Sequence, residues 1–175
     1  MELADGSVEM GHLPVPECYT FAAAQGWFEL GALKESALEL KELSDIAQQD
    51  LDVLIFKTKL FCRLGQFELS KELAFKALQA APDDLDAWLI FAECIYRLDG
   101  APAALGCLTK LERLLDQNHR YCIALGRYYA VLGDSESATD WLCKSFSHGD
   151  ALKEMERFPE LKPYLAAMAE ALARA

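Results

Sequence analysis

The stretch that decides the fold is HRYCIALGRYYAVLGDSESATDWLCKSFSHGD, residues 119–150. Apolar residues recur in it at three- and four-residue steps on both sides of Gly133, the spacing of one face of a helix. Glycine ends a helix readily, because a left-handed conformation at the C-cap strains it least. Asp134 and Ser135 then offer side chains that can cap a second helix. The stretch therefore predicts two short helices joined by a tight turn.

The same pattern recurs in the three preceding blocks of 34 residues, which begin at Glu17, Leu51 and Leu85, without an insertion between blocks. Asp83 and Asp84 precede Leu85 and can cap the helix that begins there. The fifteenth place holds a glycine in three blocks, and the third block has one at the next residue: Gly31, Gly65, Gly133 and Gly100. The twentieth place is small in every block: Ser36, Ser70, Ala104 and Ala138. A small residue there lets the second helix approach the first closely. One hairpin cannot bury its apolar face alone, so the repetition predicts an all-α, right-handed α-α superhelix of stacked hairpins.

These residues resemble the tetratricopeptide repeat (TPR) family. The fourth block carries the pattern in Leu125, Gly126, Tyr129, Gly133, Ala138 and Leu142, and the third in Trp88, Phe91, Ala92, Ile95, Ala104, Leu108 and Leu111. The second block has Phe61, Gly65, Ala77 and Pro82, but Lys57 stands at a usually apolar place. The first keeps only Trp27, Gly31, Leu40 and Leu43. The whole also resembles small bacterial TPR proteins of unassigned function.

The resemblance implies a division of the chain into a tail, four repeats and a cap. The N-terminal tail would be residues 1–16. The TPR-like repeats would be 17–50, 51–84, 85–118 and 119–150. Residues 151–175 resemble the helical cap that often ends TPR domains, so we expect four helix pairs plus a C-terminal capping helix.

The resemblance also implies a concave groove. In TPR proteins the second, fifth, sixth, ninth, twelfth and thirteenth places of a block tend to face it, and we call them the inner-wall places. Among the residues at these places, thirteen are candidate partner-binding residues: Phe21, Phe28, Ile55, Phe56, Lys59, Arg63, Leu89, Ile90, Tyr96, Arg97, Arg120, Ile123 and Arg127. Because five of them are cations, we expect the groove to bind an apolar peptide or helix that carries acidic groups.

Other interpretations of the same residues stay open at this point. The apolar members can pack against the next block, and the charged ones can form ion pairs on the surface. The degenerate first block can pack against a second copy, which makes a homodimer or a larger homo-oligomeric scaffold. A client chaperone of the secretion or export type is a third possibility. The acidic tail, residues 1–16, can itself occupy the groove.

One known TPR binding mode does not fit the sequence. Members that hold chaperone tails use an Asn at the ninth place of one block and another at the sixth place of the next. Here the ninth places hold Gln25, Lys59, Glu93 and Arg127. The following sixth places hold Phe56, Ile90 and Ala124. We therefore do not expect a chaperone tail as the partner.

Charge and hydropathy exclude two further classes of partner. The formal net charge is −11, and such a chain repels nucleic acid. The first 50 residues contribute ten acidic side chains against Lys34 and Lys41. No apolar run approaches the roughly 20 residues that span a bilayer. The chain starts acidic at Met1-Glu2-Leu3-Ala4-Asp5, unlike a secretory signal, so we expect a cytoplasmic protein without membrane insertion.

No constellation of catalytic, cofactor-binding or metal-binding residues is visible. Neither Gly-x-Gly nor H-E-x-x-H occurs, and the three histidines, His12, His119 and His148, are scattered. The six cysteines form no C-x-x-C pair, so they are expected to be reduced core residues rather than zinc ligands. We therefore expect no enzyme, no cofactor and no metal.

Overall fold

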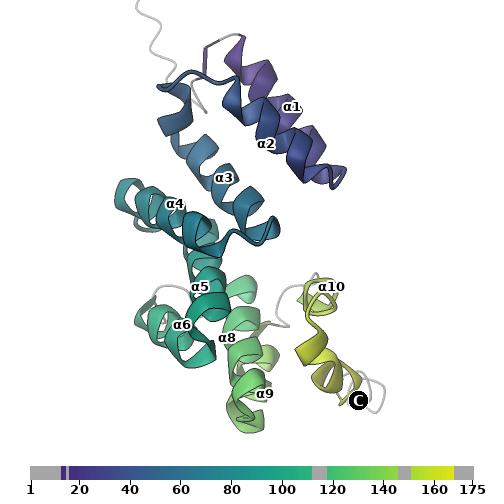
Figure 1. Ribbon diagram of the computed structural model, residues 1–175. Coiled ribbons are helices and arrows are strands. Elements are labelled where there is room, and N and C mark those ends of the chain that lie inside the picture. Colours follow the sequence, from purple (N-terminus) through teal and green to yellow (C-terminus); the bar gives the residue numbers. More distant parts are fainter. Residues whose placement is uncertain (1–12, 15, 112–117, 146–150, 168–175) are drawn as a thin grey trace, which may run out of the picture. The chain divides into compact units, whose positions relative to one another are not determined.

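The computed structural model describes residues 13–14, 16–111, 118–145 and 151–167 (Figure 1). Within these ranges every regular element is a helix, which confirms the all-α class. The elements are α1 (Glu17–Glu29), α2 (Leu33–Lys41), η1 (Ala47–Gln49), α3 (Leu51–Arg63), α4 (Phe67–Ala80), α5 (Leu85–Asp99), α6 (Ala101–Leu108), η2 (Thr109–Leu111), α8 (His119–Leu132), α9 (Ser135–Ser145), α10 (Ala151–Met155) and η3 (Pro159–Leu161). Most of the predicted tail, the end of the predicted cap, His12 and His148 lie outside the described residues.

The first helix of each hairpin begins at a 34-residue interval, at Glu17, Leu51, Leu85 and His119. Side chains cap several helix starts. The Asp84 carboxylate accepts a hydrogen bond from the Ala87 N–H at 2.6 Å, and Asp134 accepts one from Ser137 at 3.1 Å. Both caps were predicted from the sequence and are confirmed. These caps thus help to fix the residue at which each of these helices begins.

The turn inside each hairpin depends on a glycine with positive φ. The φ angles are 78° at Gly31, 76° at Gly65 and 79° at Gly133, which confirms the predicted C-caps. In the third hairpin the glycine stands one residue later, at Gly100 with φ 90°, and α5 runs to Asp99, with 15 residues against 13 in α1 and α3 and 14 in α8.

The two helices of a hairpin approach each other closely where the eighth place meets the twentieth. Ser36 Oγ donates to the Ala24 carbonyl at 2.7 Å, and Ser70 Oγ donates to the Thr58 carbonyl at 2.8 Å. In the fourth hairpin, a Cβ added at Gly126 would lie 2.7 Å from the Leu142 side chain and 3.2 Å from the Ala138 carbonyl oxygen. The small residues at these places are therefore required by contact, as the sequence predicted.

The chain forms two compact units, residues 1–90 and 91–175, and the boundary falls inside α5. The core of the first unit consists of Ala24, Leu40, Leu43, Ala47, Val53, Phe56 and Leu60. In the second unit α10 and η3 pack on α8, around a cluster of Ile123, Leu142, Ala151, Met155 and Leu161. The predicted domain boundaries and the handedness of the superhelix stay predictions.

Two glycines of the first hairpin should respond in opposite ways to alanine. Gly31→Ala places a Cβ on a residue with φ 78° and should cost about 1 kcal/mol of stability. Gly26→Ala, within α1, meets open space and should add about 0.5–1 kcal/mol through helix propensity. Hydrogen exchange of the α1 and α2 amides measures both effects. Equal protection in the two variants would contradict this account of the turn.

Candidate functional site

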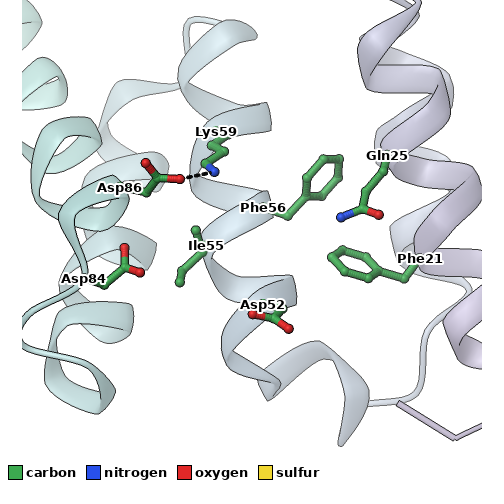
Figure 2. A pocket seen from close by; sticks show the side chains of 8 residues that line it. All are labelled: Phe21, Gln25, Asp52, Ile55, Phe56, Lys59, Asp84 and Asp86. Atoms are coloured by element: carbon green, nitrogen blue, oxygen red, sulfur yellow. Dashed lines mark hydrogen bonds and ion pairs between the residues drawn. The ribbon is translucent and has the colours of Figure 1, made fainter. Parts of the chain in front are cut away.

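A pocket of about 290 Å³ lies on the first unit, between α1, α3 and the start of α5 (Figure 2). Its lining residues are Phe21, Gln25, Asp52, Ile55, Phe56, Lys59, Asp84 and Asp86. Seven of these eight stand at inner-wall places, and Asp84, the cap of α5, is the exception. The pocket therefore gathers residues that lie far apart in the sequence on one surface.

An aromatic cluster lies beside this pocket, and two of its rings, Phe21 and Phe56, belong to the lining. The Phe56 ring meets Phe21 edge-on at 5.4 Å between centroids and Phe28 at 5.3 Å. Phe56 is only 7% exposed and belongs to the core, whereas Phe21 and Phe28 are partly buried against it. The guanidinium of Arg63 lies 4.6 Å from the centroid of Phe28. Since edge-to-face ring pairs stabilise packing, the cluster holds α1 against α3.

The charge of the pocket is negative. Lys59 Nζ forms an ion pair with Asp86 Oδ2 at 2.5 Å, and Asp52 and Asp84 add two more carboxylates (Figure 2). Three carboxylates against one ammonium leave a formal charge of −2 on the lining. This sign differs from the cationic groove that a count of lysines and arginines in the sequence suggested.

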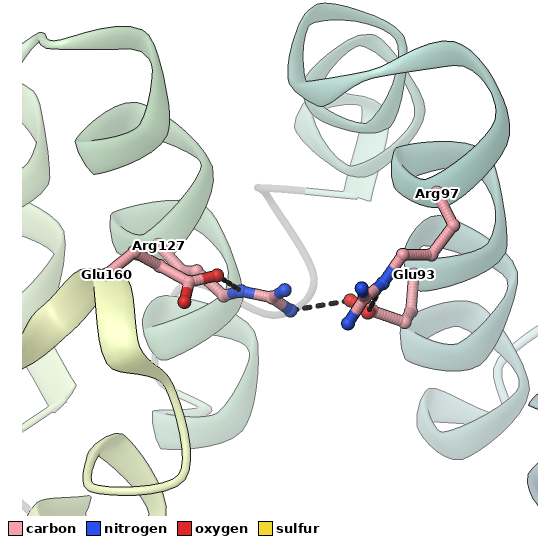
Figure 3. Close-up of polar contacts among 4 residues, drawn as sticks. All are labelled: Glu93, Arg97, Arg127 and Glu160. Atoms are coloured by element: carbon pink, nitrogen blue, oxygen red, sulfur yellow. Dashed lines mark hydrogen bonds and ion pairs between the residues drawn. The ribbon is translucent and has the colours of Figure 1, made fainter. Parts of the chain in front are cut away.

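In the second unit, a buried arginine joins three helical segments (Figure 3). Arg127 of α8 is 5% exposed, and its guanidinium contacts Glu93 of α5 and Glu160 of η3, each at 2.5 Å. It also lies over the rings of Tyr96, at 4.8 Å, and Phe158, at 4.5 Å. Because both carboxylates and two rings enclose it, Arg127 takes a structural role.

The protonation of this network follows from its contacts. Burial alone would lower the pKa of Arg127, but the charges and hydrogen bonds of Glu93 and Glu160 raise it. Partial burial would raise the pKa of Glu160. The hydrogen bond and the charge of Arg127 have the larger effect, so the pKa of Glu160 lies below its ordinary value. The hydrogen bond from Arg97 to Glu93, at 2.8 Å, raises the pKa of Arg97. The raised pKa of Arg127 and the lowered pKa of Glu160 both favour the charged forms of this pair at neutral pH.

The predicted site residues are divided between the two units. Phe21, Ile55, Phe56 and Lys59 line the pocket, with Phe28 and Arg63 beside it in the aromatic cluster. Leu89 and Ile90 are half-buried on the part of α5 that belongs to the first unit. Tyr96, Arg97, Arg120, Ile123 and Arg127 belong to the second unit. Ile123 is 1% exposed, so it stabilises the core and offers no surface.

Four of the five predicted cations are paired with carboxylates of the chain itself. Besides the pairs of Lys59, Arg97 and Arg127, the Arg120 guanidinium lies 3.5 Å from Glu154. These pairs weaken the expectation that the cations attract acidic groups of a partner. Asp84 was predicted only as a helix cap, and nothing in its sequence context separates that role from lining a pocket.

The described ranges also bear on membrane, metal and thiol chemistry. Within them, no helix is both long and apolar enough to cross a membrane. The same residues hold no group of three or more His, Cys, Asp and Glu side chains placed for a metal ion. All six cysteines are free thiols, with Cys94 and Cys122 buried.

The described hairpins and their turns give the chain a fold of the TPR type. Known structures with this fold include a thermophilic TPR protein of Thermus thermophilus, with a TM-score of 0.68, 21% identity and 91% of each chain covered. Another is a MamA fragment from Desulfovibrio magneticus RS-1, with a TM-score of 0.64, 16% identity, and 92% of this chain and 93% of that chain covered. No protein-family model and no curated protein matches the sequence. The likeness at these identities shows a shared fold.

The buried arginine should matter far more for stability than its exposed neighbour. Arg127→Met leaves Glu93 and Glu160 without their shared cation and should cost the second unit about 2–3 kcal/mol. The matched change Arg97→Met removes an exposed pair within one helix and should cost about 0.5 kcal/mol or less. Hydrogen exchange of the α8 amides measures both. Similar costs would show that the network is not what holds this unit together.

The pair of Glu160 and Arg127 should make the second unit sensitive to acid. Because the folded-state pKa of Glu160 is lowered, its contribution is present above its unfolded pKa of about 4.5 and is lost as pH falls through the folded value. Glu160→Gln should therefore lower stability at pH 7 and flatten its decline below about pH 4.5. Unfolding of wild type and variant between pH 7 and pH 3 measures this. Parallel pH profiles would speak against it.

Proposed function

We propose that the chain is a protein-binding module whose partner, a peptide or a helix, lies on the surface that α1, α3 and the start of α5 form in the first unit. The observation that carries this proposal is the pocket of the first unit, since seven of its eight lining residues stand at inner-wall places. The TPR protein of Thermus thermophilus shares the fold, with a TM-score of 0.68. The fold supports the proposal, and the pocket gives it a location to test.

The chemistry of the pocket favours an occupant with an apolar stem and a cationic end. Phe21 and Ile55 offer apolar contact beside the buried Phe56. Asp52 and Asp84 supply charge that Lys59 does not neutralise, because its ammonium pairs with Asp86. A lysine or arginine side chain meets both demands, since its methylene stem packs while its charged head stays polar. At this pocket we therefore propose a basic group on the partner in place of the acidic groups expected from the sequence.

Homo-oligomeric scaffolding and export-type chaperone activity stay predictions of the sequence. Light scattering of the purified chain tests the first, since a homodimer doubles the mass in solution.

A displayed library of random peptides tests the proposed site with the full chain as bait. We expect the enriched peptides to carry Lys or Arg next to apolar residues. The variant Asp52→Lys should bind them about tenfold more weakly, because it reverses an exposed charge at the pocket. Asp45→Lys makes the same change at an exposed position outside the pocket and should leave affinity unchanged. Acidic peptides, or equal binding to both variants, would overturn the proposal.

A further inference from the structure

A second and larger hollow lies on the first unit, between α2, α3 and α4. Its volume is about 750 Å³, within the range of sites that enclose a ligand or a partner's side chains. The lining residues are Lys34, Ala37, Leu38, Leu40, Lys41, Gln48, Lys57, Phe61, Leu64, Gln66, Leu69 and Leu73. We call it the lysine-rimmed hollow. None of its lining residues is a predicted site residue.

The wall of the lysine-rimmed hollow is apolar and partly open to solvent. Leu38 of α2 is 59% exposed and Leu69 of α4 is 39% exposed. Phe61 of α3 and Leu64, which follows the end of α3, are partly buried in the same lining. Contiguous exposed apolar side chains on a folded unit are typical of an interaction surface. The hollow thus offers a place where a partner's apolar side chains can leave water.

The charge of this hollow is positive, in contrast to the chain as a whole. Lys34, Lys41 and Lys57 contribute +3, and no Asp or Glu is among the lining residues, whereas the whole chain carries −11. Within the described ranges none of the three lysines forms an ion pair. A negatively charged partner would therefore gain attraction here that the chain does not already satisfy.

Lys57 is fixed in place at the hollow. Its ammonium donates to the Gln48 carbonyl at 3.3 Å and to Gln48 Oε1 at 3.0 Å. Both acceptors are neutral, so the positive charge is held but not cancelled. Burial, together with the nearby Lys76, lowers the pKa of Lys57, a cost that an anion bound in the hollow would offset. This is the lysine that departs from the apolar pattern of the repeat.

The two hollows of the first unit lie on opposite sides of α3. Ile55 and Lys59 line the pocket described above, whereas Lys57 and Phe61 line the lysine-rimmed hollow. Residues two apart on a helix point about 200° away from each other. A partner in one hollow therefore leaves the other free, and an inference about the second does not depend on the first.

The spacing of the lysines indicates what kind of anion fits. Lys34 and Lys41 are seven residues apart on α2, which is about 10 Å along the helix axis. A single carboxylate, such as the headgroup of a fatty acid, is too small to meet both. Two acidic side chains two turns apart on a second helix have the same separation.

We propose that the lysine-rimmed hollow binds an amphipathic helix of a partner protein, with its apolar face on Leu38 and Leu69 and with acidic residues two turns apart facing Lys34 and Lys41. This is the helix-in-groove mode of recognition, with charge pairs at the rim and apolar burial between them. The acidic, apolar partner that the sequence suggests for the inner wall fits this side of the first unit instead.

Two synthetic helical peptides test the proposal against the isotope-labelled full chain. The first carries leucines on one face and two Glu residues two turns apart, and the second has Lys in place of both Glu. We expect the Glu peptide to shift the amide resonances of α2 and α4, including Leu38 and Leu69. The Lys peptide should bind at least about tenfold more weakly.

Variants of the protein with reversed charges test whether the lysines themselves select the peptide. Lys34→Glu with Lys41→Glu should weaken the Glu peptide about tenfold and strengthen the Lys peptide. The control, Lys110→Glu with Lys153→Glu, makes the same net change at exposed positions of the second unit and should alter neither. Circular dichroism checks that each variant keeps its helix content. Equal affinity for both peptides, shifts confined to α1, or displacement of the Glu peptide by palmitate would overturn the proposal.

Discussion

The close approach of two helices inside each hairpin is the constraint on which the rest of the structure depends. In the first two hairpins a serine hydroxyl reaches the facing backbone carbonyl, at 2.7 Å from Ser36 and 2.8 Å from Ser70. In the fourth, the close approach is possible because Gly126 has no side chain, and the neighbouring Leu142 leaves no room for a Cβ there. A larger side chain at either place would force the helices apart, at a cost that cores rarely absorb. The two helices of a hairpin are thus held close by a hydrogen bond in the first two hairpins, and by the absence of a side chain at Gly126 in the fourth.

Because the two helices of a hairpin touch along one face, the other sides of the first helix can line surfaces that a partner could contact. The small residue of α3 that faces α4 is Thr58, which is fully buried. On either side of that contact, α3 presents Ile55 and Lys59 to one hollow and Lys57 and Phe61 to the other. Two surfaces of opposite charge can therefore share one helix, because about 200° separate residues two apart.

The sequence predicted features that depend on neighbouring residues, and it missed features that depend on contacts between residues far apart in the chain. The turn glycines and the caps at Asp84 and Asp134 follow from residues within one turn of each other, so they could be predicted. The sign of the pocket could not, because it depends on which charged residues line the same hollow, and of the five predicted cations only Lys59 does. The resemblance to TPR proteins likewise placed Ile123 on the inner wall, although it is 1% exposed, since the segment that covers it lies outside the repeats. Lys57, a lysine at a usually apolar place of the repeat, was the one feature of the sequence that pointed to the lysine-rimmed hollow.

Net charge is a poor guide to the partners of such a chain. At physiological salt the Debye length is about 8 Å, so a bound partner responds mainly to the charges lining its own contact. The three lysines of the lysine-rimmed hollow belong to its lining, whereas none of the chain's 28 acidic residues does. The net charge of the chain then repels an acidic partner at long range, which slows association. On contact the lysines attract the partner, but only where its acidic residues match the spacing of Lys34 and Lys41. An acidic chain with an inset basic surface thereby gains selectivity among acidic partners that net charge alone would reject.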